Sequence, residues 1–504
     1  MSLAAGAMVL AACSGSGSSS GSANPNGALR FGYDFASQFT NLDPGHSTGD
    51  CDALVQGPIF DTLVHQDAGG ALVPGLASSW SIQGQTLTLH IRPGVKFSDG
   101  EVFDANAVKL GLEHLEKDTT YVDLSTITSI TVPDAMTVVV TLKDTPPIEL
   151  LYSLRGREGM IVAPNHIATA TTDPVGAGPM TFQSYSPGAS VMERANPTYW
   201  QKGTLYKFGG INFTQVGVGP PSVTALKAGS VDMVSIQPDN YPSVKSAPGI
   251  GVAVQNTTAY LQFQFRFTPP FDNLDVRKAA EFAINRAQIN QVVQSGLGEV
   301  ATETFFKASP GYNTAVDNLY PYDAAKAHQL LVQSGLPLPI KITMAIPGGN
   351  ISSMEDQAAI IQQDLNAVGF SVTISRILGS QIATNYYING SANAFAAQRP
   401  GEPYPPVQIY DQWGSGQFVA IYSKGQRPDI TSIIQRALNA PSAADGYALT
   451  RQAEAIVMQN ALDVPIAFAP ELEAYSTSTV GGVVKAQTGV CDAPDLSGVL
   501  VKKT

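Results

Sequence analysis

The chain has 504 residues, of which 44% are apolar and 14% charged, and its formal net charge is −12. This composition predicts a globular protein of two or three domains and excludes a disordered chain. The acidic balance argues against a nucleic-acid-binding protein, which needs a basic face. After the first residues no run of about 18 apolar residues occurs, so we expect no internal membrane span.

The N-terminal residues predict export. The run from Leu3 to Ala12 is too short to span a bilayer and is typical of the apolar region of a signal peptide. Leu10-Ala11-Ala12-Cys13 is similar to a lipobox, at which bacterial lipoproteins are cut and lipidated. We therefore expect a signal peptide over 1–12 and lipid on Cys13; a buried helix with an incidental cysteine is the alternative. Because residues 1–12 contain no Lys or Arg, we expect the natural start upstream.

The Gly/Ser-rich stretch over 13–28 lacks the residues that form a core, so it predicts a flexible tether behind the lipidated cysteine. Two further cysteines, Cys51 and Cys491, form an even pair in a compartment that permits disulfides. A bridge between them and two separate buried thiols both fit the sequence.

Strands dominate the first half. The alternation over 87–91 and the β-branched run over 137–142 predict strands, and residues 129–142 read as two strands around a Pro-Asp-Ala turn. Residues 101–116 predict a helix with Asp104 as its N-cap.

In the second half, helices and strands alternate. Residues 275–296 predict one helix ended by Gly296, and residues 322–335 predict another, capped by Asp323 and ended by Gly335. A third helix begins with a capping-box-like pair, Ser353 and Asp356, and ends at Gly369, where the strand 370–374 follows at once. This alternation indicates an α/β or α+β protein with a mixed sheet and more than one lobe.

The sequence offers no convincing catalytic or metal-binding motif. The G-x-S-x-G match at 17–21 lies in the tether, and the G-x-G-x-x-A match at 296–301 closes a helix where a dinucleotide site must open one. The six histidines are scattered without metal-ligand spacing, which favours surface or core histidines; a histidine pair assembled by the fold is the alternative. Carboxylates such as Asp118 and Asp123 indicate a solvated face. We expect no cofactor, no metal and no enzyme.

A longer stretch, residues 74–114, resembles family 5 solute-binding proteins, the dipeptide, oligopeptide and nickel receptors of bacterial ABC importers. The resemblance rests on Leu76, Ala77, Trp80, Arg92, Gly94, Val95, Phe97, Asp99, Gly100, Ala105 and Val108. The Asp99-Gly100 pair also predicts a hairpin turn. Further similar blocks follow in the family's order at 42–44, 59–64, 176–200, 225–233, 269–289 and 464–468.

The family's fold implies a two-lobed α/β protein of the type II, cluster C-like kind, with the lobes joined by two hinge strands. Carried over, lobe 1 comprises 29–68, 176–255 and 470–504, an extra subdomain of lobe 1 comprises 69–175, and lobe 2 comprises 256–469. A Cys51–Cys491 bridge would then lie within lobe 1. The ligand would bind between the lobes and favour their closed state.

The segment 396–416 departs from the family's peptide-binding pattern, in which an aspartate pairs with the ligand's α-amine. Glu402 is the candidate replacement, and Arg399 would favour an anionic ligand; a mutual ion pair on a loop is the alternative for both. Trp413 would stack on a ligand or pack in the core. The other candidates are Gln264, with a half-exposed strand residue as its alternative, Tyr404, and Tyr33 on position alone.

The function that this resemblance implies is the capture of a polar solute, first of all a peptide, and its delivery to the permease and ATPase subunits of an importer. An oligosaccharide or other solute, a receptor for a membrane sensor, and an exported hydrolase are the alternatives. We expect a monomer, exported and lipid-anchored on the outer face of the cytoplasmic membrane or periplasmic.

Overall fold

The computed structural model describes residues 22–33, 41–46, 52–67, 71–117, 124, 126–143, 146–201, 206–217, 219–348, 352–378, 381–402, 404–414, 427–440, 442–485 and 495–503. The predicted signal peptide, Cys13, Cys51 and Cys491 lie outside these residues. Among the helices so described, none is both long and apolar enough to cross a membrane.

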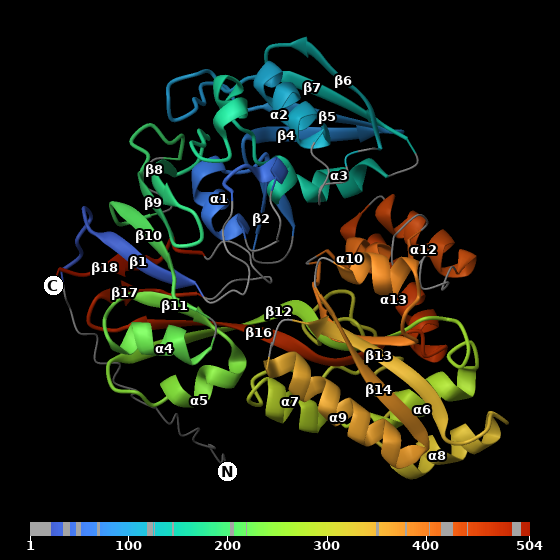
Figure 1. The fold of residues 1–504 in the computed structure, drawn as a ribbon. Coiled ribbons are helices and arrows are strands. Elements are labelled where there is room, and N and C mark those ends of the chain that lie inside the picture. The colour runs from blue at the N-terminus through green and yellow to red at the C-terminus, as the bar shows by residue number, and fades with distance from the viewer. Residues whose placement is uncertain are drawn as a thin grey trace, which may run out of the picture.

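A ten-stranded mixed sheet runs through the molecule, in the order β14-β13-β15-β12-β16-β11-β1-β10-β9-β8. One half of this sheet belongs to lobe 1 and the other to lobe 2 (Figure 1). The lobe 1 strands are β1 (Ala28–Tyr33), β8 (Met180–Ser186), β9 (Ser190–Ala195), β10 (Gly210–Gln215) and β11 (Met233–Ile236). The lobe 2 strands are β13 (Ile340–Gly348), β14 (Phe370–Leu378) and β15 (Ala394–Arg399).

Two long strands, β12 (Ile250–Phe265) and β16 (Val464–Ser476), cross from one lobe to the other. They pair with each other antiparallel, with register shifts between Asn256 and Tyr260 and between Leu261 and Gln262. β16 also pairs with β11 in lobe 1, and β12 pairs with β15 in lobe 2. The two crossing strands therefore join the lobes within one continuous sheet.

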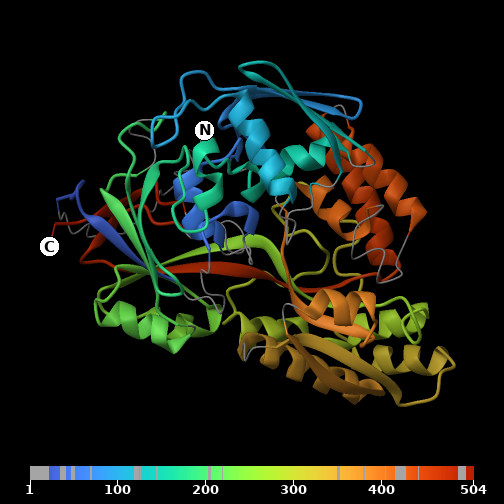
Figure 2. The same cartoon turned by 45° about the horizontal axis from the view of Figure 1, so that its top comes forward.

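A separate four-stranded sheet forms an extra subdomain above lobe 1, most easily seen in Figure 2. Its strands are β4 (Ala77–Gln83), β5 (Thr86–Ile91), β6 (Ile127–Asp134) and β7 (Thr137–Leu142), and α2 (Ala105–Lys117) packs against it. The short ribbons β2 (Val64–Gln66) with β3 (Leu72–Pro74), and β17 (Val480–Gly482) with β18 (Val499–Val501), complete the strands of the described residues.

Helices cover both halves of the large sheet (Figure 1). On the lobe 1 side they are α1 (Ala53–Phe60), α4 (Pro220–Lys227) and α5 (Tyr241–Val244), whereas α3 (Pro147–Ser153) packs against β5 of the four-stranded sheet. On the lobe 2 side they are α6 (Leu274–Ala283), α7 (Arg286–Val293), α8 (Ala324–Gln333) and α9 (Ser352–Val368). Three further helices, α10 (Pro405–Trp413), α12 (Pro428–Leu438) and α13 (Ala443–Gln459), pack on one another beside this half of the sheet. Short 3-10 segments lie at 44–46, 157–159, 164–169 and 238–240, and a π-helical turn lies at 383–388.

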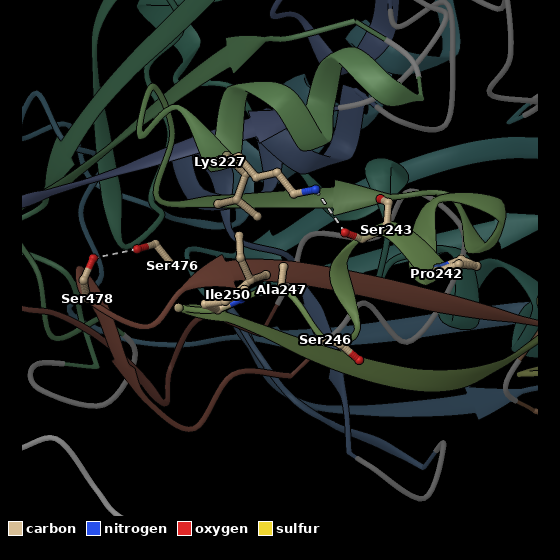
Figure 3. Close-up of a pocket in the computed structure, with 11 residues that line it drawn as sticks. Lys227, Pro242, Ser243, Ser246, Ala247, Ile250, Ser476 and Ser478 are labelled. Carbon is tan, nitrogen blue, oxygen red and sulfur yellow. Dashed lines mark hydrogen bonds between the residues drawn. The ribbon is translucent and has the colours of Figure 1, made fainter.

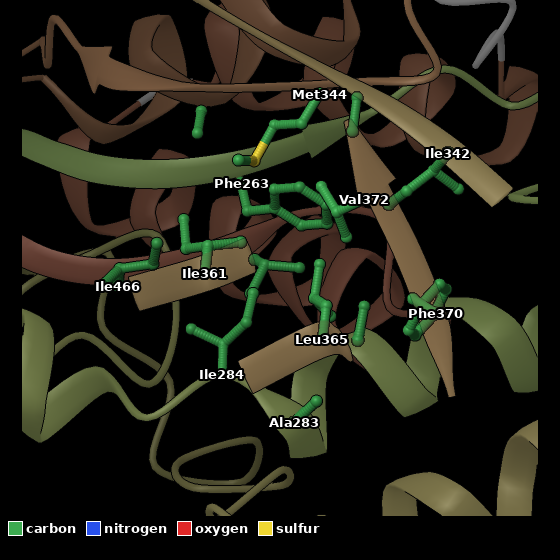
Figure 4. Packing of buried hydrophobic residues seen from close by; sticks show 14 of the residues in the cluster. Phe263, Ala283, Ile284, Ile342, Met344, Ile361, Leu365, Phe370, Val372 and Ile466 are labelled. Carbon is green, nitrogen blue, oxygen red and sulfur yellow. The ribbon is translucent and has the colours of Figure 1, made fainter. Parts of the chain in front are cut away.

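The core of lobe 2 is apolar. Side chains of β12, β13 and β14, among them Phe263, Met344 and Phe370, meet Leu365 of α9 in one buried cluster (Figure 4). Phe265 and Phe271 add an aromatic pair with ring centroids 4.7 Å apart. Burying this apolar surface provides the main driving force for folding the lobe.

Most of the predicted elements are present at the expected places. The strands at 87–91 and 137–142 are confirmed, and Asp104 caps α2 by accepting a 2.9 Å hydrogen bond from the Ala107 amide. Asp323 caps α8 in the same way, and Gly335 beyond its end adopts a positive φ of 73°. The turn at Asp99-Gly100 is confirmed by a bridge between Lys96 and Val102.

Two helix predictions are wrong in detail. Residues 275–296 form two helices, because Asn285 interrupts the helix between α6 and α7 and caps α7 by accepting a hydrogen bond from the Gln288 amide. The second helix, α7, ends at Val293, before Gly296. In α9, the helix already includes Ser352, so Ser353 lies inside the helix and not at its N-cap.

Candidate functional site

The clearest contact between the lobes joins α3 and the turn behind it to the start of α10. Figure 1 shows these two helices facing each other. Arg155, just after α3, forms an ion pair with Glu402, just before α10. Tyr152 and Tyr404 stack beside this pair, with ring centroids 4.5 Å apart and planes inclined by 8°. We call these four residues the interlobe contact.

A cavity of about 190 Å³ lies at this contact. Its wall carries four carboxylates and one guanidinium, and is formed by Glu149, Tyr152, Ser153, Arg155, Gly156, Glu158, Glu402, Val407 and Asp411. The volume is below the roughly 300–1,000 Å³ that is usual for a small-molecule site. In this arrangement the cavity therefore has room for one end group of a ligand.

Two of the carboxylates at the cavity, Asp411 and Glu158, hold protons more tightly than free carboxyl groups do. Burial first, and repulsion by Glu402 next, raise the pKa of Asp411 well above its ordinary value. Burial also raises the pKa of Glu158, and the nearby arginines only partly oppose that rise. A cationic group placed among these carboxylates would relieve both effects, since an opposite charge favours the ionised form.

Arg399 stands at the end of β15, opposite Tyr260 of β12. Its Nε atom is buried and has no hydrogen-bond partner. The positive charge of Arg399 opposes the rise in pKa that burial causes at Asp411 and at Asp463, which accepts a 2.9 Å hydrogen bond from the Tyr260 hydroxyl. The alternative of an ion pair with Glu402 is wrong, because Glu402 pairs with Arg155.

Gln264 lies on β12, and its side-chain oxygen accepts a 2.9 Å hydrogen bond from the Tyr387 hydroxyl. It is only 8% exposed, so the alternative of a half-exposed strand residue is wrong. Tyr404 adds to its stacking with Tyr152 an edge contact to Tyr447 at 5.8 Å.

Trp413 ends α10 and packs in the apolar cluster between α10, α12 and α13, with its ring 5.9 Å from that of Phe267. Its indole Nε1 is buried without a hydrogen-bond partner.

Tyr33 is fully buried in the core of lobe 1, where burial raises the pKa of its phenol. The interlobe contact therefore includes Glu402 and Tyr404, with Arg399 three residues before Glu402, whereas Tyr33 belongs to a lobe core.

Sequence reasoning missed the opposite side of this contact, namely Tyr152, Arg155 and Glu158, and also Asp411. One signal was present: Arg155, Arg157 and Glu158 form a dense charged group in a chain that is only 14% charged. Glu402 and Arg155 are 247 positions apart, so only the fold brings them together.

A second, larger cavity of about 640 Å³ lies in lobe 1, between the end of α4, the segment after α5 and the start of β12 (Figure 3). Lys227 Nζ donates a 3.0 Å hydrogen bond to the Ser243 carbonyl there, and the hydroxyls of Ser476 and Ser478 are 2.8 Å apart. No residue of the interlobe contact lines this cavity, and Lys227 is its one charged lining residue. It is therefore a weaker candidate for the ligand site.

Residues 71–419 match the family of bacterial extracellular solute-binding proteins, family 5, over its middle region. The chain belongs to this family. A relative, the glutathione-binding protein GsiB of Salmonella paratyphi A, is 26% identical over 482 residues, which cover 90% of this chain and 91% of the relative. Family 5 proteins serve ABC importers and act in the periplasm or outside the cell.

Solved structures of family 5 proteins share the fold. DppA from Helicobacter pylori in complex with the peptide STSA has a TM-score of 0.78 at 21% identity, over 95% of this chain and 98% of that one. AgaA from A. tumefaciens R10 in complex with agropinic acid has a TM-score of 0.80 at 22% identity, over 95% and 99%. The two-lobed α/β architecture that the sequence predicted is thereby confirmed.

Proposed function

We propose that this protein captures a peptide between its two closing lobes at the interlobe contact and delivers it to the permease of an ABC importer. The observation that carries the proposal is the cavity of four carboxylates around Arg155, with Glu402 paired to that arginine. A peptide has an ammonium at one end and a carboxylate at the other. Its ammonium would replace Arg155 as the partner of Glu402, and its carboxylate would pair with Arg155 or Arg399.

This exchange keeps the charges of Arg155 and Glu402 paired, which matters because both side chains are partly shielded from water, at 20% and 29% exposed. Arg155 and Glu402 neutralise each other across the lobes. A zwitterionic ligand supplies a partner for each of them and so links the lobes in their place. The relative that binds glutathione, a tripeptide with one ammonium and two carboxylates, supports this class of ligand.

The proposal keeps the lobe boundaries predicted above, the signal peptide over 1–12, the lipid on Cys13 and an exported, membrane-tethered monomer without catalytic activity. The mass of the mature N-terminal peptide tests the lipid, and a non-reducing peptide map tests the Cys51–Cys491 bridge. Recovery of a bound peptide intact by mass spectrometry tests the absence of hydrolysis.

The ligand is tested by thermal shift and calorimetry with di- to pentapeptides including glutathione, small oligosaccharides, opines and nickel chelates. A ligand at about a hundred times its dissociation constant stabilises the fold by about 2.7 kcal/mol. We expect peptides to shift the melting temperature and the same peptides with an acetylated amine to fail. A shift by sugars or anionic solutes alone would refute the peptide proposal and leave the family assignment intact.

The variant Glu402→Gln tests the site. It removes the proposed partner of the ammonium, so we expect peptide affinity to fall by at least about tenfold, because hydrogen bonds to charged groups contribute about 1.5–3 kcal/mol. Glu355→Gln is the matched control: Glu355 also forms an ion pair, with Arg376, but on the surface of lobe 2. If both variants lose affinity equally, or if neither loses it, the ammonium of the peptide binds elsewhere.

A further inference from the structure

Two histidines from distant parts of the chain converge on one buried carboxylate outside the interlobe contact. Asp43 precedes the 3-10 turn that ends at His46, and its side chain is 1% exposed. His46 Nδ1 lies 3.1 Å from Asp43 Oδ2, and His114 Nε2, from α2, lies 2.9 Å from the same oxygen. The centroids of the two imidazole rings are 6.1 Å apart.

This spacing fits a metal ion. Each of the three residues offers one ligand atom, and these atoms lie within 4.8 Å of one another. Metal–ligand bonds of about 2.0–2.1 Å at tetrahedral angles separate neighbouring ligand atoms by about 3.3 Å. The two separations measured from the Asp43 oxygen are a few tenths of an ångström shorter than that, and the ligand atoms of the two histidines lie within 4.8 Å of each other. Rotation of the side chains therefore has to adjust all three separations to admit an ion.

The backbone around Asp43 holds the carboxylate in place. The Gly45 amide donates a 2.9 Å hydrogen bond to Asp43 Oδ1, and a Cβ on Gly45 would lie only 3.4 Å from both Asp43 Oδ1 and His114 Nε2. Asn41 brackets the turn, because its side chain accepts from the Asp43 amide at 2.7 Å and donates to the His46 carbonyl at 2.8 Å. These contacts fix the Asp43 carboxylate and the turn that carries His46, and they leave the ring nitrogens of both histidines available to an ion.

We propose that Asp43, His46 and His114 bind a divalent first-row transition-metal ion, with Zn²⁺ as the reference ion. Imidazole nitrogens and a carboxylate oxygen are ligands that Zn²⁺ and its neighbours accept. Three protein ligands leave the fourth coordination position of the ion open. Because the side chain of His46 is 45% exposed, water can reach the ion at this position. The ion ties the N-terminal segment to α2 of the extra subdomain.

A second group, Asp99, Glu101 and His166, also brings three ligand atoms within 4.8 Å. None of its residues is buried, and Asp99 is exposed. Binding an ion there has to fix partly exposed side chains, which costs conformational entropy. This group is therefore the expected weaker site and supplies the comparison for the experiment. The metal site is independent of the proposed transport function.

The test is calorimetric titration of the full chain, stripped of metal with chelator and dialysed, with ZnCl₂. We expect one tight equivalent of Zn²⁺ and a rise in melting temperature that EDTA reverses. His46→Gln and His114→Gln should each weaken this binding by at least about tenfold, because even changes outside a ligand set weaken metal binding by about that factor. His166→Gln is the matched control and should leave the tight equivalent unchanged.

Three results would overturn the proposal: no tight binding of Zn²⁺, tight binding that His46→Gln retains, or tight binding that is lost in His166→Gln alone. His46 is half-exposed, so its variant should fold, and circular dichroism verifies this. If His114→Gln fails to fold, His46→Gln decides the question.

Discussion

The core of lobe 2 and the interlobe contact are built from different kinds of residue. In the core, aliphatic and aromatic side chains from β12–β14 and α9 pack against one another (Figure 4). At the interlobe contact, an ion pair and two stacked tyrosines lie beside a cavity. The core gains its stability from burying apolar surface and has no need of a ligand. The contact keeps charged groups partly buried, which is costly without good partners. Stability and binding thus depend on different residues, so the two can be changed separately.

The largest expected effect comes from cutting a side chain out of the lobe 2 core. Leu365 is fully buried, so Leu365→Ala should lower the free energy of unfolding by about 2–5 kcal/mol, through lost burial and the cavity left behind. Peptide affinity of the folded protein should not change. Denaturant unfolding and calorimetry measure the two quantities. Val332→Ala, at a position 58% exposed, is the control and should change stability by less than about 0.5 kcal/mol.

The next effect is a dependence on pH at the interlobe contact. The raised pKa of Asp411 means that the folded protein binds this proton more tightly than the unfolded chain does. Stability is therefore present below the ordinary pKa of the carboxyl group and is lost as the pH rises through the raised pKa, by at most about 1.4 kcal/mol per pH unit for one proton.

The variant Asp411→Asn cannot ionise, so its stability should fall less steeply with pH than that of the wild type. Thermal unfolding across a pH series measures the difference. Leu365→Ala should keep the wild-type slope, because it removes no titrating group. Parallel curves for Asp411→Asn and the wild type would show that Asp411 does not titrate in this way.

The smallest expected effect is the loss of the ion pair between the lobes. Arg155 and Glu402 are partly exposed, at 20% and 29% of their side chains, so Arg155→Met should cost only about 1 kcal/mol of stability. The same variant should raise the population of open molecules several-fold, which small-angle scattering detects as a larger radius of gyration. Arg376→Ala removes an ion pair within lobe 2 and should leave the radius unchanged; an equal change in both variants would contradict the role of Arg155.

Local features were predictable from the sequence because their causes are local. Asp104 and Asp323 cap their helices through amides three residues ahead, and a short window of sequence contains both partners. The break between α6 and α7 was missed because the apolar periodicity of residues 275–296 runs through Ile284, while Asn285 acts as a cap in the middle of that pattern.

The candidate site was only half predictable. The resemblance to family 5 led to Glu402 and Tyr404, but their partners, Arg155 and Tyr152, come from a part of the chain about 250 residues earlier. Such pairings depend on how the lobes approach each other, and no periodicity or local motif encodes that approach. For the same reason the scattered histidines gave no sign that His46 and His114 meet at Asp43.

The two ends of the described chain lie side by side. The Asn24 amide donates to the Val501 carbonyl at 2.7 Å, and the Lys503 amide donates to the Ser22 carbonyl at 3.0 Å. A short linker can therefore join Ser22 to Lys503, and new termini can be opened in a surface loop of lobe 2 without disturbing the crossing strands. Such a circular permutant places a fluorescent reporter on lobe 2, and if the lobes close on the ligand as proposed, the protein becomes a scaffold for a biosensor of its own ligand.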